Sequence, residues 1–204
     1  MDDRHVVKDA YDEMATVYAE RVVSGSSPGP PEPVRRFRDE LGPEDELLDA
    51  GCGPGRRTLE LVGERGVGLD ISREQLSLAR ETVAAPLVQG DMTALPFTSD
   101  SFDAVCAMYS LIHVPVDDHR TVLEEFARVL RPGGWLLVTE GGVEWTGSNP
   151  DWLDSGTEMH WSMAGREATR ADIEACGFEI RGVWDVPDPT TEEGEKPFFL
   201  ATLS

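Results

Sequence analysis

Lysine is nearly missing from this sequence of 204 residues. Only Lys8 and Lys196 occur, so arginine supplies the other 16 of the 18 basic residues. Aspartate and glutamate number 39, which gives a formal net charge of −21. Such a surface repels phosphate backbones and anionic membranes, so we expect neither nucleic acid nor a membrane as a partner. The composition is typical of halophilic proteins, in which salt screens the repulsion between like charges.

Cysteine and long apolar runs are also scarce. The three cysteines, Cys52, Cys106 and Cys176, are scattered and odd in number, so we expect neither a disulfide framework nor a metal site. No apolar run approaches the length of a membrane span, and the first residues are too charged for a signal peptide. We expect one cytoplasmic domain over residues 1–204.

Glycine, in contrast, is plentiful, and in one segment it recurs at alternate positions. The segment LLDAGCGPGRRT (47–58) carries an acid, Asp49, and then Gly51, Gly53 and Gly55 at alternate positions. Glycine permits a positive φ and leaves room for a ligand to approach the backbone. A glycine turn between a strand and a helix is the form of a nucleotide-binding loop in a doubly wound sheet.

The remaining pattern supplies the context that this loop needs. Strands and helices alternate from residue 46 to residue 140, which predicts an α/β fold with a mostly parallel sheet and helices on both faces. The expected strands are 46–50, 66–71, 86–90, 102–112, 135–140, 178–186 and 197–203. The expected helices are 4–22, 33–41, 56–63, 73–83, 117–131 and 166–176, and we expect 141–165 to be irregular.

Three further features follow the glycine loop in order. Asp70 ends the second strand, 21 residues after Asp49, near the spacing at which a carboxylate meets the ribose of a bound nucleoside. Asp91 and Met92 follow the third strand, where an acid can accept the amino protons of adenine. The buried fourth strand runs into polar residues at the edge where such sheets bind ligands.

Together with RVLRPGGWLLV (128–138), these motifs resemble the class I S-adenosylmethionine (SAM)-dependent methyltransferases. The sequence is similar to the type 11 methyltransferase domain and to quinone-biosynthesis methyltransferases over residues 45–140. The resemblance implies a Rossmann-like seven-stranded sheet with an antiparallel last strand. It divides the domain into an N-terminal helical cap (1–41), a SAM-binding core (42–140) and an acceptor-side segment with a closing helix and strands (141–204).

The resemblance also implies SAM as the cofactor and assigns its contacts. The implied cofactor-binding residues are Tyr11, Tyr18, Asp49, Gly51, Cys52, Gly53, Gly55, Asp70, Ile71, Asp91, Met92 and Tyr109. For Tyr11 and Tyr18, which share one face of the first helix, the alternative is packing in the core or in a lid. The loop differs from the G-x-G-x-x-G pattern of dinucleotide-binding proteins, because Arg56 stands where the last glycine would be. This difference favours SAM over NAD.

The methyl acceptor is expected to be a small molecule. His113, at the exit of the fourth strand, is the candidate general base; the alternative is a strand-end histidine bonded to the backbone. His113, Trp145, His160 and Trp161 are the candidate acceptor-binding residues, and no metal is expected. The Asn/Asp-Pro-Pro-aromatic run of nucleic-acid amino-methyltransferases is missing after the fourth strand. A macromolecule methyltransferase, a non-catalytic SAM-binding regulator and a homodimer stay open.

Overall fold

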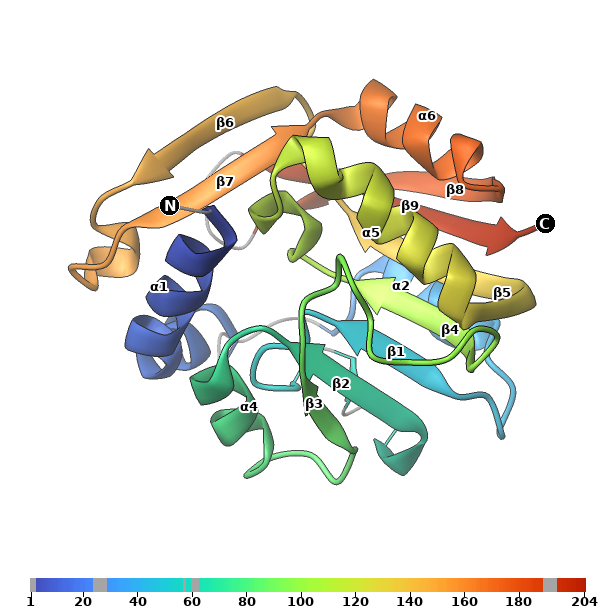
Figure 1. Cartoon of the computed structure of the whole chain (residues 1–204), viewed down its shortest axis with the longest axis horizontal. Helices are drawn as coiled ribbons and strands as arrows, with labels where there is room; N and C mark the ends of the chain where they lie inside the picture. Colours follow the sequence, from blue (N-terminus) through green and yellow to red (C-terminus); the bar gives the residue numbers. More distant parts are fainter. Residues whose placement is uncertain (1–2, 24–28, 57, 60–62, 189–193) are drawn as a thin grey trace.

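The fold is built on one seven-stranded sheet (Figure 1). The computed structural model describes residues 3–23, 29–56, 58–59, 63–188 and 194–204. The strands are β1 (Leu47–Ala50), β2 (Gly66–Asp70), β3 (Leu87–Gln89), β4 (Phe102–Ala107), β5 (Leu130–Thr139), β8 (Phe178–Pro187) and β9 (Glu195–Leu203). Their order is β3-β2-β1-β4-β5-β9-β8, and β9 runs antiparallel to both of its neighbours. The predicted doubly wound sheet with an antiparallel last strand is confirmed.

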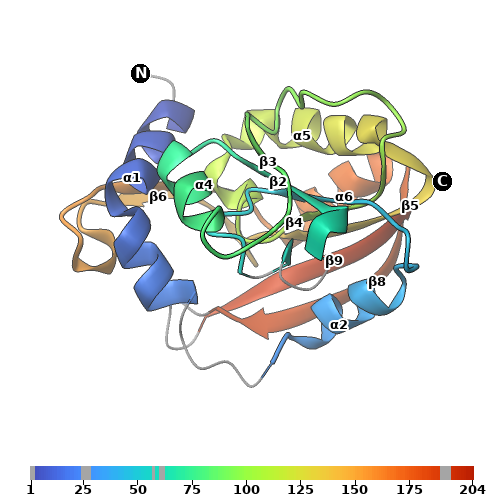
Figure 2. The same ribbon diagram turned by 90° about the horizontal axis from the view of Figure 1, so that it is seen from below.

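Helices cover both faces of this sheet (Figure 2). Alternate residues of a strand point to opposite faces, and the central strands are apolar on both. Leu48 and Val105 pack in one cluster with α5 (Val116–Val129) and α6 (Arg166–Ala175). Leu47 and Cys106 pack in another cluster with α2 (Glu32–Asp39). A short helix, α4 (Arg73–Ala79), follows β2, and Ser72 caps it as expected by accepting from Gln75 N at 3.1 Å.

The first helix lies apart from these layers. Helix α1 (Asp3–Tyr18) continues into a π-helical turn (Ala19–Val23) and lies on the side to which the arrowheads of β1, β2 and β4 point (Figure 1). Val7 and Met14 on its apolar face are buried and pack with Trp152 and Met159. Helix α1 therefore faces the carboxyl edge of the sheet, where parallel α/β folds bind ligands.

The segment that we expected to be irregular is instead a β-hairpin. Strand β6 (Glu144–Asn149) pairs antiparallel with β7 (Met159–Ala164), and a 3₁₀ turn (Trp152–Asp154) lies between them. The expectation for 141–165 is wrong because β6 is almost entirely exposed and polar. A strand with no buried face has no alternation of apolar and polar residues to reveal it.

The fourth strand is shorter than expected. It ends at Ala107, and Leu111–His113 form a 3₁₀ turn. Tyr109, placed near the middle of the expected strand, lies beyond its end with a φ of 59°, a left-handed conformation that breaks the ladder. The helix expected at 56–63 falls partly on residues 57 and 60–62, which lie outside the described residues, and Gly63–Arg65 is a 3₁₀ turn.

Candidate functional site

The glycine loop crosses the end of β2. Gly51, Gly53 and Gly55 all have a positive φ, between 53° and 79°. The backbone N–H groups of Gly51 and Cys52 both donate to the carbonyl of Leu69, at 2.7 and 3.0 Å. A Cβ at Gly51 would lie 2.3 Å from Ser110 Cβ, so no larger residue fits there without movement. The loop needs glycine both for its backbone conformation and for close packing.

Asp70 ties this loop to the next helix. Its Oδ2 accepts from Gly53 N at 2.8 Å, and its Oδ1 accepts from Ser72 N at 2.9 Å. The residue is 8% exposed, and burial raises the pKa of Asp70 to about 6, with a smaller contribution from the Asp12 carboxylate. Each carboxylate oxygen keeps a further lone pair for a hydroxyl donor.

A cavity lies at this edge of the sheet and is partly open to solvent; the space within it, open solvent included, is about 680 Å³. Its lining brings together ten of the residues that the sequence analysis singled out: Tyr11, Tyr18, Gly51, Gly53, Asp70, Ile71, Asp91, Met92, Tyr109 and His113. Residues from α1, the glycine loop, the end of β2 and the segments after β3 and β4 therefore meet at one site.

Three predicted cofactor residues do not line the cavity. Asp49 is 3% exposed within β1, and Cys52 packs in an apolar cluster with Leu59 and Leu76. Gly55 faces Val83. These residues shape the loop from behind, and their direct contact with a cofactor stays a prediction.

Among the cavity residues that the sequence analysis missed are two polar residues on helices, Arg4 and Gln75. Arg4 Nη1 lies 3.2 Å from Asp91 Oδ2 and donates to Thr93 Oγ1 at 2.8 Å, so α1 reaches the proposed adenine side. Gln75 is 1% exposed and lines the cavity, and neither atom of its amide has a hydrogen-bond partner in the described structure. A buried amide without hydrogen bonds lowers the stability of the folded protein. Gln75 is therefore a candidate ligand-binding residue. The sequence of a helix does not distinguish polar residues that line a cavity from polar residues that face solvent.

His113 is held from both sides of its ring. The carbonyl of His160 lies 2.8 Å from Nδ1, and the hydroxyl of Tyr11 lies 2.9 Å from Nε2. A carbonyl only accepts, so Nδ1 carries the proton and Nε2 accepts from Tyr11. Burial lowers the pKa of His113 to about 4, so the ring is neutral at pH 7.

A second cavity, of about 460 Å³, meets the first at His113. His160 and Trp161 line it together with Thr146, Ser148 and Ser162 from the β6–β7 hairpin. Trp145 lines neither cavity and is 44% exposed, although its ring centroid lies 6.3 Å from that of Trp161. Of the candidate acceptor residues, His113, His160 and Trp161 therefore gather around one space and Trp145 stands beside it.

Two features are absent from the residues that the structure describes. No group of three or more His, Cys, Asp or Glu side chains there could hold a metal ion. No helix there is long and apolar enough to cross a membrane.

Comparison with known proteins defines the class. The sequence profile of a methyltransferase domain matches residues 48–138. The chain is 30% identical over 154 residues to the O-methyltransferase rstn1 of Aspergillus nomiae, and this match covers 70% of this chain and 68% of that protein. It is 45% identical over 102 residues to the demethylmenaquinone methyltransferase of Mycobacterium sp. (strain JLS), and this match covers 49% of this chain and 43% of that protein. The chain belongs to the SAM-dependent methyltransferase family. The chain spans only 58% of the length of each of two other curated relatives.

The fold agrees with this assignment. Magnesium protoporphyrin IX methyltransferase of Synechocystis PCC 6803, solved with bound SAM, matches with a TM-score of 0.75 over 100% of this chain and 98% of that chain. At 16% identity this similarity shows the fold alone. The cofactor of the family is SAM.

Proposed function

We propose that this protein transfers a methyl group from SAM to a small-molecule acceptor. The observation that carries the proposal is the cavity at the carboxyl edge of the sheet. There a buried carboxylate, Asp70, and a buried unpartnered amide, Gln75, line the same space. The small-molecule methyltransferases among the relatives support the choice of acceptor.

The residues of the cavity fit the chemistry of SAM. Asp70 can only accept hydrogen bonds when ionised, whereas the amide of Gln75 can also donate. Ribose hydroxyls do both, so Asp70 can accept from the diol while Gln75 donates to it. Asp91 and Met92 offer an acceptor and a thioether to adenine. Backbone N–H groups of the glycine loop suit the carboxylate at the amino-acid end of SAM.

SAM supplies an electrophilic methyl group on its sulfonium. The chain's own contribution is then to align an acceptor with that group and to exclude water. Helix α1 covers the cavity with Tyr11 and Tyr18, and the hairpin places His160 and Trp161 on the acceptor side. The two cavities meet at His113, which is where the cofactor and the acceptor would come together.

The Tyr11–His113 pair can move a proton if the acceptor is a hydroxyl. As the acceptor oxygen bonds to the methyl carbon, its proton passes to the Tyr11 oxygen and the Tyr11 proton passes to His113 Nε2. SAM, held by the glycine loop and Asp70, would supply the methyl group and would keep the electron pair of its carbon–sulfur bond on sulfur, leaving S-adenosylhomocysteine. Because burial lowers the pKa of His113, its acquired proton is readily released to solvent.

Incubation with methyl-labelled SAM and fractionated cell extract tests this function. We expect label in a low-molecular-weight product, with turnover reduced about a hundredfold in Tyr11→Phe and His113→Ala, the lower end for general acid–base catalysis. Asp39→Asn is the matched surface control, since Asp39 is exposed on α2. Label in protein or RNA would make the chain a macromolecule methyltransferase, and SAM binding without label anywhere would make it a non-catalytic SAM-binding regulator.

A further inference from the structure

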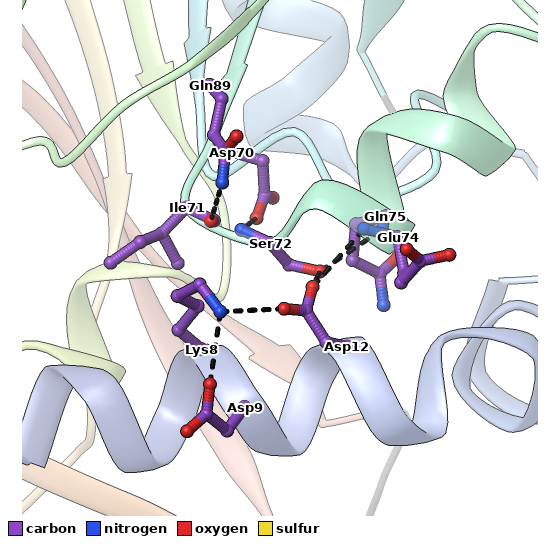
Figure 3. Close-up of polar contacts among 9 residues, drawn as sticks. All are labelled: Lys8, Asp9, Asp12, Asp70, Ile71, Ser72, Glu74, Gln75 and Gln89. Atoms are coloured by element: carbon purple, nitrogen blue, oxygen red, sulfur yellow. Dashed lines mark hydrogen bonds and ion pairs between the residues drawn. The ribbon is translucent and has the colours of Figure 1, made fainter.

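One carboxylate attaches helix α1 to the first turn of α4. Asp12 Oδ1 accepts from the hydroxyl of Ser72 at 2.6 Å and from Glu74 N at 3.2 Å (Figure 3). Its other oxygen, Oδ2, lies 2.8 Å from Lys8 Nζ. Lys8 also contacts Asp9, at 3.0 Å, but the Asp9 side chain is 71% exposed and points away from α4 in Figure 3. Asp12 alone of these three charged residues reaches across to α4 in Figure 3.

Ser72 connects this carboxylate to the one in the cavity. Ser72 is fully buried, and its backbone N–H donates to Asp70 Oδ1 at 2.9 Å while its hydroxyl donates to Asp12. The same hydroxyl oxygen accepts from Gln75 N at 3.1 Å. The orientation of Ser72 therefore depends on Asp12, and the position of Asp70 depends in part on Ser72.

Helix α1 brings further groups to the cavity when it is attached in this way. Tyr11 is next to Asp12 in the chain and contacts His113, and Arg4, two helical turns earlier, pairs with Asp91. One contact at Asp12 thus lies between the acceptor side and the adenine side of the site. Hydrogen bonds to a charged group are stronger than those between neutral groups, so this contact suits an anchor.

We propose that Asp12 is a positioning residue for the cofactor site, which joins helix α1 to Asp70 through Ser72. The proposal rests on the proposed function, in which Asp70 binds the ribose of SAM. Without the Asp12 carboxylate, the Ser72 hydroxyl loses its acceptor and α1 loses its hydrogen bonds to Ser72 and to Glu74 N. Helix α1, which covers the cavity, and the Asp70 carboxylate, which lines it, are then both held less firmly.

The first test uses Asp12→Ala with Asp9→Ala as its matched control. Both changes remove one aspartate from α1 and one partner from Lys8, but only Asp12 contacts α4. Hydrogen exchange of the protein without SAM should be faster for α1 amides in Asp12→Ala than in Asp9→Ala. Equal exchange in both variants would overturn the anchor, whatever the protein binds.

The second test measures SAM affinity by calorimetry. We expect Asp12→Ala to weaken binding about tenfold and Asp9→Ala to leave it within about twofold, where tenfold corresponds to about 1.4 kcal/mol. Asp12→Asn keeps an oxygen that accepts from Ser72 and should restore most of the affinity. If the wild-type protein does not bind SAM, the proposed function fails, while the exchange experiment still decides the anchor.

A double-mutant cycle separates positioning from a general effect on α1. If Asp12 acts through Ser72 on Asp70, the loss caused by Asp12→Ala should shrink to less than about threefold in an Asp70→Asn background, because coupled residues are not additive. Additive losses of affinity would show that Asp12 only holds the helix, and the connection to Asp70 would be wrong.

Discussion

The buried state of Asp70 predicts that SAM affinity depends on pH. Burial raises the pKa of this carboxyl to about 6, so half of the protein without ligand carries a protonated Asp70 at that pH. A protonated carboxyl accepts hydrogen bonds less well, and ribose hydroxyls that donate to Asp70 favour its ionised form. If only the ionised form binds SAM, affinity at about pH 5 is about tenfold weaker than at pH 7. Above pH 7 it should level off.

The same shift acts on stability in the opposite direction. The ordinary pKa of an aspartate is 3.8, so between about pH 4 and pH 6 the folded protein holds more protons at Asp70 than the unfolded chain does. Stability contributed by this group therefore falls as pH rises through that window, by about 3 kcal/mol for a shift of this size. The charged carboxylate is kept at a cost to stability, which is typical of a binding group.

Calorimetric titration of SAM at pH 5, 6, 7 and 8 measures the first effect, and denaturant unfolding of wild type and Asp70→Asn at about pH 4, 5, 6 and 7 measures the second. Asn cannot ionise, so the variant should bind SAM weakly and without this pH dependence. The reasoning is refuted if wild-type affinity is flat between pH 5 and 7, or if Asp70→Asn shows the same slope.

Three further predictions address the cavity, the loop and the surface. Gln75→Leu should raise the melting temperature by several degrees, because it removes a buried unpaired amide that destabilises the fold by about 1–3 kcal/mol. The same change should lower SAM affinity, and a loss of both stability and affinity would contradict the ligand role. Gly51→Ala should lower stability more than Gly63→Ala, since both have a positive φ but only Gly51 meets a neighbour within 4 Å of its added Cβ; equal losses by chemical denaturation would rule out the contact with Ser110. The net charge of −21 predicts that the melting temperature rises with KCl over the molar range; a flat or falling curve would rule out halophilic behaviour.

The core of the fold could be predicted because its signals are local. Strands buried on both faces are continuous apolar runs, and the glycines of the loop mark the first turn of the sheet. The end of β4 could not be predicted, because the apolar run continues through Leu111 and Ile112 although Tyr109 has already left the strand. Apolar residues alone do not distinguish a strand from a buried 3₁₀ turn.

The candidate site could be predicted only where a residue type stands out. Asp70, Asp91 and His113 follow strands, and the sheet edge brings them together. Asp12 and Gln75 lie on helices among other polar residues, so only the structure reveals that one attaches α1 and the other has no partner.

The two lysines show the same limit. The sequence shows that lysine is scarce, but only the structure shows which carboxylates the two lysines contact. Lys8 pairs with Asp12, which is bonded to Ser72 beside the cavity, and Lys196 pairs with Asp188 at 3.3 Å, where both side chains are largely buried. The predicted surface of acidic residues is thus accompanied by lysines that serve specific contacts.

Calorimetric titration with four ligands decides whether the cavity is a SAM site. We expect the protein to bind SAM and S-adenosylhomocysteine at the cavity that Asp70 and Gln75 line, and Asp70→Ala to weaken both through loss of a charge-assisted hydrogen bond. NAD and ATP should bind far more weakly, because the loop has the G-x-G-x-G pattern rather than that of a pyrophosphate site. Comparable binding of NAD, or SAM affinity unchanged in Asp70→Ala, would show that Asp70 and the glycine loop do not form a SAM site.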